Sequence, residues 1–496
     1  MATSRRALLA LAAAVVAAGP LAAQLPEADS AFQRGDYRAA RAAYERVLAA
    51  DSTSLRALHQ LALLDSWNGK LRRSLERLGR LRQLAPGDAD VMVDQARVYA
   101  WAGRTQASEA LYDSVLTRFA DRTDALAGRA RAVAWSGDLD RAEHLWRDAL
   151  AAHPDAAELL IGLAQTLYWK GEPGLAEAYA TRARALAPGD RSALELERAL
   201  RAALRPEVVT SSNGAGDSDH NDFVAWDGSY TTSAGSRVRA TVAAGWRHAT
   251  DRARTATSYG ARGYGVAALG RGAVLRAGAG VRRLAPELGA ATTPLTAELG
   301  LGIRPGRYAA ASIGYSRAPF DETALLIDSG FVIDAVDASL DLAPSPRVSV
   351  SAGGGAAWLS DGNRRTSAVL AVLARALPGL QLGPFARVLS YDTTPGHGYF
   401  APNRFTVLEG RAIYDWRRAR WGVRADVGAG SQQVSDSAPR QFEWHLGLSV
   451  TRGWGADNEL ALVGAVTNSA AAAAPSSTPT EGFRYRTLML RFRQGL

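Results

Sequence analysis

Five glycines recur at the same spacing of 34 residues along the N-terminal part of the chain. They are Gly35, Gly69, Gly103, Gly137 and Gly171, and a tryptophan lies two residues before four of them, at Trp67, Trp101, Trp135 and Trp169. An aromatic or apolar residue also recurs nine positions after most of the glycines, at Tyr44, Leu78, Tyr112 and Trp146. Such spacing indicates a repeated structural unit that buries its apolar face by stacking on its neighbours.

Each unit is predicted to consist of two amphipathic helices, such as Asp124–Trp135 and Asp138–Ala151, with the glycine in the tight turn between them. A helix pair of this length is typical of the tetratricopeptide repeat (TPR). The sequence therefore predicts five TPR units followed by a capping helix at Asp190–Leu204. The four tryptophans have two interpretations, which are packing between helices and a ring-stacking surface for sugars.

The first 23 residues have the pattern of a secretory signal peptide. Arg5 and Arg6 precede an uncharged run from Ala7 to Ala18, and Gly19-Pro20 interrupts it before a small residue at Ala23. A membrane anchor is the less favoured alternative, because the run is short and Gly-Pro would end a helix. We therefore expect residues 1–23 to direct export and residues 24–205 to form a periplasmic TPR solenoid.

From Pro206 onward, apolar residues recur at every second position. One clear segment has Phe442, Trp444, Leu446, Leu448 and Val450 on one face, and Glu443, His445, Gly447 and Ser449 on the other. Segments of this length fit tilted strands that cross a bilayer, and aromatic residues near their ends fit interfacial girdles. A soluble β-sandwich would also alternate, but it usually buries larger apolar side chains than the alanine, valine and leucine found here.

The connections between these segments alternate between short turns and longer polar loops. Seven short turns and eight longer loops, which include Ala318–Ser329 and Thr393–Asn403, join sixteen strands. An even number brings both ends of a barrel to one side, which we expect to be the periplasm. The predicted fold is therefore an all-α TPR solenoid followed, over residues 206–496, by an all-β transmembrane outer-membrane barrel of about 16 antiparallel strands.

Composition narrows the range of functions. Lys and Arg total 58 against 49 Asp and Glu, and lysine occurs only at Lys70 and Lys170. No basic run or cluster stands out, so nucleic acid is not an expected partner. With no cysteine, disulfides, Cys-ligated zinc and thiol catalysis are excluded. No nucleophile arrangement, catalytic carboxylate pair or phosphate loop stands out, and we expect no enzyme activity, no cofactor and no metal site.

Two repeat segments carry a family resemblance. The helices ending Tyr99-Ala100-Trp101-Ala102-Gly103 and Val133-Ala134-Trp135-Ser136-Gly137, followed by a C-terminal barrel, resemble the YaiO family of outer-membrane β-barrel proteins. The resemblance covers nearly the whole mature chain and implies an outer-membrane location. The same domain order is similar to that of the exporters of cellulose and poly-N-acetylglucosamine, whose TPR arrays are longer.

These observations predict a channel or export pore for polar or anionic solutes, with exopolysaccharide as the specific candidate. The alternative is an outer-membrane anchored interaction scaffold with a closed, non-conducting barrel. Expected partners are outer-membrane lipid, a periplasmic or envelope protein bound by the TPR array, and polysaccharide. The residues expected to line the pore share the polar face of their strands, and arginine predominates among them: Arg237, Arg239, Arg247, Arg276, Arg282, Glu298, Arg304, Arg347, Glu409, Arg411, Arg424, Asp426 and Glu443.

Overall fold

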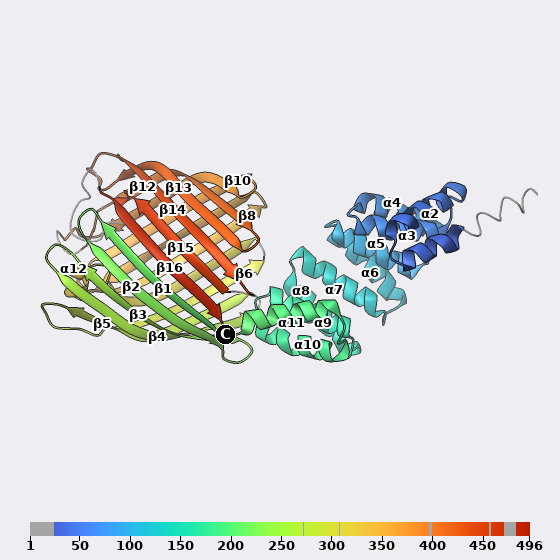
Figure 1. The fold of residues 1–496 in the computed structure, drawn as a ribbon, viewed down its shortest axis with the longest axis horizontal. Helices are drawn as coiled ribbons and strands as arrows, with labels where there is room; N and C mark the ends of the chain where they lie inside the picture. Colours follow the sequence, from blue (N-terminus) through green and yellow to red (C-terminus); the bar gives the residue numbers. More distant parts are fainter. Residues whose placement is uncertain (1–23, 271, 307, 396–398, 456–457, 471–482) are drawn as a thin grey trace, which may run out of the picture. The chain divides into compact units, whose positions relative to one another are not determined.

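Helices come first and strands follow in the computed structural model (Figure 1). The structure describes residues 24–496 except 271, 307, 396–398, 456–457 and 471–482. The segment 1–23, predicted to be a signal peptide, lies outside the described residues. The chain divides into two compact units, Met1–Thr166 with Tyr179–Ala193 and Leu167–Ala178 with Leu194–Leu496.

Sixteen antiparallel strands form one closed barrel, which confirms the predicted strand number and the antiparallel arrangement. Each strand pairs with its neighbours in sequence, and β1 closes on β16 from Glu207 opposite Gly495 to Asp217 opposite Tyr485. The strands are β1 (Glu207–Asp217), β2 (Asp222–Ser233), β3 (Val238–Thr250), β4 (Thr255–Gly270), β5 (Ala273–Pro286), β6 (Leu295–Gly306), β7 (Ala309–Pro319), β8 (Val332–Ser345), β9 (Val348–Leu359), β10 (Arg364–Leu377), β11 (Leu380–Tyr391), β12 (Phe405–Arg418), β13 (Trp421–Gln433), β14 (Gln441–Trp454), β15 (Asn458–Thr467) and β16 (Tyr485–Gly495).

The two ends of the barrel differ in their connections. At one end, the turn end, short turns such as 378–379 join the strands, and β1 begins and β16 ends there. At the other end, the loop end, the connections include 320–331 and 392–404. The first of these contains the short helix α12 (Ala324–Ser329). The predicted alternation of short turns and longer loops is therefore present.

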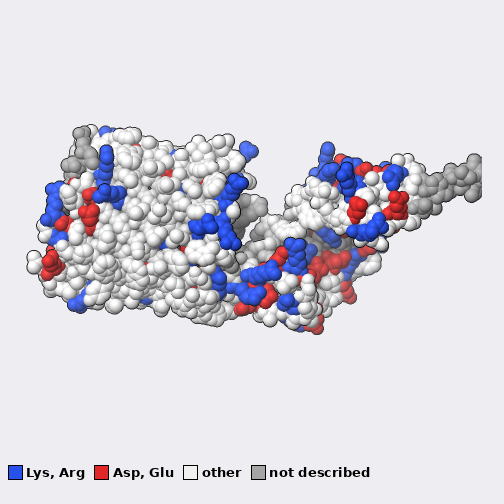
Figure 2. Space-filling view, viewed as in Figure 1, with Lys and Arg blue, Asp and Glu red and all other residues white. Residues whose placement is uncertain are grey.

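The outer face of the barrel is apolar. Alternate residues along each strand leave large apolar side chains exposed, among them Leu299, Leu301, Leu446, Leu448 and Leu490. On the face that Figure 2 shows, charged residues gather toward the two ends of the barrel and are sparse between them. A large exposed apolar surface of this kind is typical of a face that contacts lipid or another protein.

The helical region is built from helix pairs. A helix over residues 24–33 precedes α2 (Tyr37–Ala50), α3 (Leu55–Trp67), α4 (Leu71–Leu84), α5 (Ala89–Trp101), α6 (Thr105–Arg118), α7 (Thr123–Ser136), α8 (Leu139–Ala152), α9 (Ala157–Trp169), α10 (Pro173–Leu186) and α11 (Arg191–Leu204). Within the first compact unit, α2 to α7 each contact the helix that follows in sequence. Among the described residues, no helix has the length and apolar character that a membrane span requires.

The five repeated glycines lie in the turns between paired helices. Each has a left-handed backbone, with φ between +72° and +96°. A side chain at these positions would be strained, because a Cβ atom disfavours that region of φ. The glycines therefore recur every 34 residues because each tight turn between paired helices needs a left-handed backbone.

The residues nine positions after the glycines form the core between repeats. Tyr44, Leu78, Tyr112 and Trp146 are all fully buried. Trp146 packs against Gly162 of α9, where a Cβ atom would come within 2.3 Å of the indole ring. The Trp146 Nε1–H donates to the Thr166 hydroxyl at 3.0 Å, so the buried polar atom is satisfied.

The tryptophans that precede the glycines are not buried in this way. Trp67, Trp101, Trp135 and Trp169 are 38–49% exposed. Trp67 does contact the ring of Phe32, at 5.7 Å between centroids. The packing between helices expected from the sequence is therefore incomplete, and much of each indole ring meets solvent.

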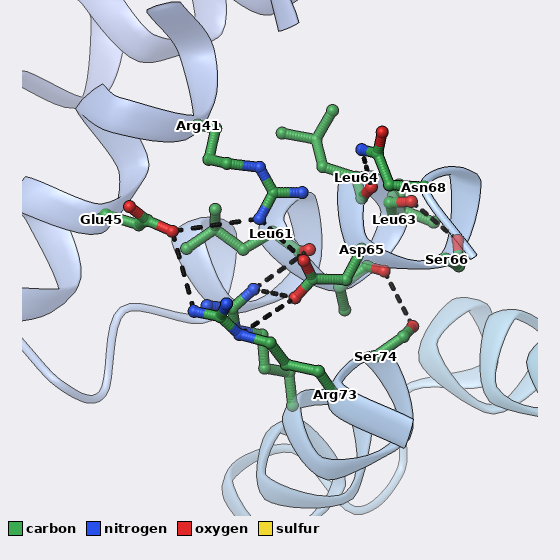
Figure 3. A network of polar contacts seen from close by, with 12 residues as sticks. Arg41, Glu45, Leu61, Leu63, Leu64, Asp65, Ser66, Asn68, Arg73 and Ser74 are labelled. Carbon is green, nitrogen blue, oxygen red and sulfur yellow. Dashed lines mark hydrogen bonds and ion pairs between the residues drawn. The ribbon is translucent and has the colours of Figure 1, made fainter. Parts of the chain in front are cut away.

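A buried carboxylate ties three helices together near the start of the solenoid (Figure 3). Asp65 of α3 is fully buried, and its Oδ1 accepts from Arg41 Nη1 of α2 at 2.7 Å. Its Oδ2 meets Arg77 of α4 and lies 3.6 Å from Arg73 Nε. Glu45 lies at the exposed edge of the same network, 3.9 Å from Arg41. Asp65 therefore neutralises guanidinium groups from two neighbouring helices.

Replacing Asp65 tests this link. Asp65→Asn keeps the volume but leaves three arginines around a neutral group, so we expect the helical region to lose about 3–5 kcal/mol of stability. Urea unfolding of the full-length chain, followed by helical circular dichroism, measures the loss. Glu45→Gln is the matched control, because its ion pairs are exposed and removing them costs less than about 1 kcal/mol. Equal losses in the two variants would contradict the assignment.

Candidate functional site: the interior of the barrel

The residues expected to line a pore share the inner face of the barrel by register. In an antiparallel sheet, directly opposite residues point to the same side. Glu409 lies opposite Gly430, which in turn lies opposite Glu443. Arg411, Gly428 and His445 form the next inner row. The register also places on the inner face every other strand residue that was expected to line the pore. Arg237 and Arg347 lie outside the strands, in the turns that precede β3 and β9.

Several of these side chains pair along the wall between neighbouring strands. Arg276 Nε on β5 donates to Glu298 on β6 at 3.0 Å. Arg411 Nε on β12 donates to Asp426 on β13 at 2.8 Å, and Arg424 lies 3.4 Å from Asp415. Each of these pairs joins residues on adjacent strands. They leave the polar inner face largely neutralised where they occur.

Other expected residues have different partners. Arg239 Nη1 donates to the carbonyl of Leu204 at 2.9 Å, so this guanidinium holds the chain just before β1. Arg247 and Arg282 bind Asp321, which precedes α12. Glu409 and Glu443 meet His445, a residue that was not among those expected to line the pore.

The connection 320–331 folds into the barrel, where the sequence predicts a polar loop. Asp321 fixes it to the wall: its Oδ2 accepts from Ser258 Oγ at 2.6 Å and from Arg282 Nε at 2.8 Å. Arg247 Nη1 donates to the Asp321 carbonyl at 2.8 Å. Hydrogen bonds to charged partners are among the stronger ones in proteins. The segment is therefore tethered to the inner face of β3, β4 and β5.

Apolar contacts on both sides of α12 complete the inward packing. Ala324 and Ile327 pack with Ala249, Ala256 and Leu284 of the β3–β5 wall, and Leu326 packs in a cluster with Leu359, Tyr391 and Tyr399. The second set belongs to β9, β11 and the connection 392–404. The segment thus contacts two separate parts of the wall, and it narrows the loop end of the barrel.

Tyr399 fixes the second long connection in the same layer. Its hydroxyl donates to Asp361 at 2.7 Å and accepts from Asn363 Nδ2 at 2.9 Å. Burial, together with the bond to Asp361, raises the pKa of Tyr399 well above its usual range. The phenol therefore stays neutral and keeps its proton for Asp361 at all ordinary pH values.

A cavity of about 600 Å³ lies inside the barrel against β16 and β1 to β7. Its lining includes Asp227, Arg262, Tyr264, Arg282 and Glu298, with Asp321 at one side. Arg276 lies over the Tyr264 ring, with 4.0 Å between its Cζ and the ring centroid. A wall with guanidinium groups, carboxylates and one aromatic face suits a polar ligand and does not suit a hydrocarbon one.

The Asp321 tether can be tested with a single-cysteine reporter, because the chain has no cysteine of its own. Ile327→Cys places a thiol at a buried position on α12. Adding Asp321→Asn removes charge-assisted hydrogen bonds worth about 1.5–3 kcal/mol each. We therefore expect labelling by a small maleimide to accelerate at least about tenfold.

The control for this experiment is Asp328→Asn in the same reporter background. Asp328 is also on α12, but it faces Arg254 at 3.6 Å and is more exposed than Asp321. We expect its labelling rate to stay close to that of the reporter alone. Equal acceleration by both substitutions would show that Asp321 has no special part in holding the segment.

No protein-family model and no curated protein sequence matches the chain. Among solved structures, one described as a bacterial polysaccharide outer membrane secretin is 13% identical, with 58% of this chain and 98% of that chain covered and a TM-score of 0.46. A tetratricopeptide repeat protein from Parabacteroides merdae is 16% identical over 36% of this chain and 71% of its own, with a TM-score of 0.35. Likeness at these values carries no function from those proteins to this chain.

Proposed function

We propose that the protein is an outer-membrane channel of the YaiO type that passes polar, negatively charged solutes, with its helical repeats in the periplasm. The segment 1–23 acts in this proposal as the export signal. The apolar outer face of the barrel supports a membrane location, because such a belt is stable against lipid and costly against water. Aromatic side chains toward strand ends, such as Trp246, Trp416 and Trp421, also support it, because such residues are typical of interfacial girdles.

The observation that carries the proposal is the excess of arginine on the inner face at the turn end. Inner-face positions near that end hold Arg239, Arg304, Arg375, Arg424, Arg491 and Arg493. The acidic residues that pair with them are fewer: Glu207 pairs with Arg493, Glu459 with Arg491 and Asp415 with Arg424. A mouth with net positive charge attracts anions and repels cations.

The narrower proposal is that the solute is an acidic exopolysaccharide. A chain of this kind combines negative charge with sugar rings and hydroxyl groups. The inner wall offers guanidinium groups and the Tyr264 face, and the exposed indoles at Trp67, Trp101 and Trp135 offer further faces for sugars or for a protein partner. The TPR array would then guide the chain or bind an envelope protein.

The inward-packed loop end favours a second candidate function. α12 and the connection 392–404 form a buried apolar layer with the wall. If this layer is permanent, the barrel does not conduct, and the protein is an anchor that holds the TPR array at the membrane. The two candidates differ in one measurable property, which is ion flow through the folded full-length chain.

Conductance in a planar bilayer distinguishes the two candidates. We expect the full-length protein to give channels that prefer anions. The double variant Arg304→Glu with Arg424→Glu reverses the charge at two inner-face positions and should shift that preference several-fold toward cations. The interaction energy of two unit charges about 4 Å apart in water is about 1 kcal/mol, which is enough for such a shift. The matched control is Arg418→Glu, at the same end but on the outer face of β12, where selectivity should not change.

Two results would overturn the channel proposal. One is a folded barrel that gives no conductance under any voltage. The other is an ion preference that responds equally to Arg418→Glu and to the inner-face pair. The first result would support the anchor and direct the next experiment to capture of the TPR partner.

A further inference from the structure

We propose that Glu409, Glu443 and His445 bind a divalent transition-metal ion, such as Zn²⁺, on the inner wall of the barrel. The carboxylate oxygens and the imidazole nitrogen of these three residues all lie within 4.8 Å of one another. The site is independent of whether the barrel conducts. From the sequence we expected no metal site, because its members come from strands β12 and β14, which are not adjacent.

Glycines on the strand between them let the three side chains meet. β13 separates β12 from β14, and it presents Gly430 opposite Glu409 and Glu443, and Gly428 opposite His445. A Cβ atom at Gly428 would lie 2.3 Å from His445 Cε1 and 2.5 Å from Glu409 Oε2. The space that holds the cluster therefore exists only because this position lacks a side chain.

Two of the three side chains are buried carboxylates, and their negative charges need a positively charged partner. Glu443 is 2% exposed and Glu409 is 7% exposed. Glu443 Oε2 is fully buried and accepts no hydrogen bond within the part of the chain that the structure describes. A buried carboxylate oxygen without a donor is costly, and a second carboxylate beside it adds repulsion. A divalent cation would remove both costs, because it neutralises the charge of the two carboxylates and binds the oxygen of Glu443 that has no hydrogen-bond donor.

The surroundings of His445 orient it as a metal ligand. Its Nε2 lies 3.3 Å from Asp426 Oδ1, and Asp426 is itself held by two hydrogen bonds from Arg411. A carboxylate that accepts from one imidazole nitrogen leaves the lone pair of the other nitrogen free for a metal. That other nitrogen, Nδ1, lies 3.1 Å from Glu409 Oε2. With bonds of about 2.0–2.2 Å to each atom, one ion fits between them. The ligand oxygen of Glu443 lies within 4.8 Å of both and completes the site by moving toward the ion.

An apolar layer covers the loop-end side of the cluster. Phe405 and Val407 precede Glu409 on β12 and are buried with Val434 and Ala470, and Phe385 packs against them. Both carboxylates are buried, so their attraction to an ion is stronger than it would be at an open surface. The mixed oxygen and nitrogen donors favour Zn²⁺ and its neighbours over Mg²⁺ or Ca²⁺, which prefer oxygen alone.

Metal binding by the full-length chain in detergent tests the site. After treatment with a chelator and desalting, Zn²⁺ is titrated by calorimetry, and bound metal is counted by mass spectrometry. We expect one strongly held ion per chain and at least tenfold weaker binding in Glu443→Gln. Asp426→Asn keeps all three ligands but loses the orienting carboxylate, so we expect its affinity to fall about 10–100-fold. Mg²⁺ at the same concentration should not compete.

The control is Glu298→Gln, which changes another inner-face carboxylate that pairs with Arg276 far along the wall. Its affinity for Zn²⁺ should match that of the unchanged chain, and the electrophoretic mobility of the unheated barrel should show that every variant is folded. Binding in Glu443→Gln and in Asp426→Asn that is as strong as in the unchanged chain would overturn the site. So would a folded chain that retains no Zn²⁺, which would leave the carboxylate pair to share a proton.

Discussion

The closure of β1 on β16 is the constraint on which the rest of the barrel depends. Once this pair forms, every strand has a neighbour on both sides, and the backbone has no free edge. Closure also divides every strand into an inner and an outer row. Apolar side chains such as Leu446 and Leu448 then face outward, while many charged ones, such as Arg276 and Asp426, face a confined interior. Their partners must come from the wall or from segments that fold inward.

The interior shows both solutions. Arg276 with Glu298 and Arg411 with Asp426 are pairs between adjacent strands, and they need only the register that closure sets. Asp321 is different, since it arrives on a connection and meets Arg247, Ser258 and Arg282 from three strands. The Asp321 carboxylate thus partly neutralises two guanidinium groups of the wall and also holds α12 in place. The charge balance of the wall and the packing of α12 at the loop end therefore depend on the same residue.

Local patterns made the architecture predictable. A period of two reports which face a residue occupies, and a glycine with positive φ reports a tight turn, so strand number, turn positions and helix pairs could be inferred from the sequence. The inward fold of residues 320–331 could not, because a polar start at Asp321 and Glu322 resembles a solvated loop. Thr323 and Gly330, which cap the two ends of α12, are residue types that signal a helix start and stop, but no local pattern shows what that helix packs against.

The Glu409, Glu443 and His445 cluster shows the same limit in a different form. The spacing of Glu443 and His445 places both on one face of a strand, which the alternation alone reveals. Glu409 joins them only through the register of β12 on β13 and of β13 on β14, and through the absence of a side chain at Gly428. Register is set by closure of the whole barrel. A site formed across three strands is therefore a property of the closed sheet, and its chemistry appears only when the fold is complete.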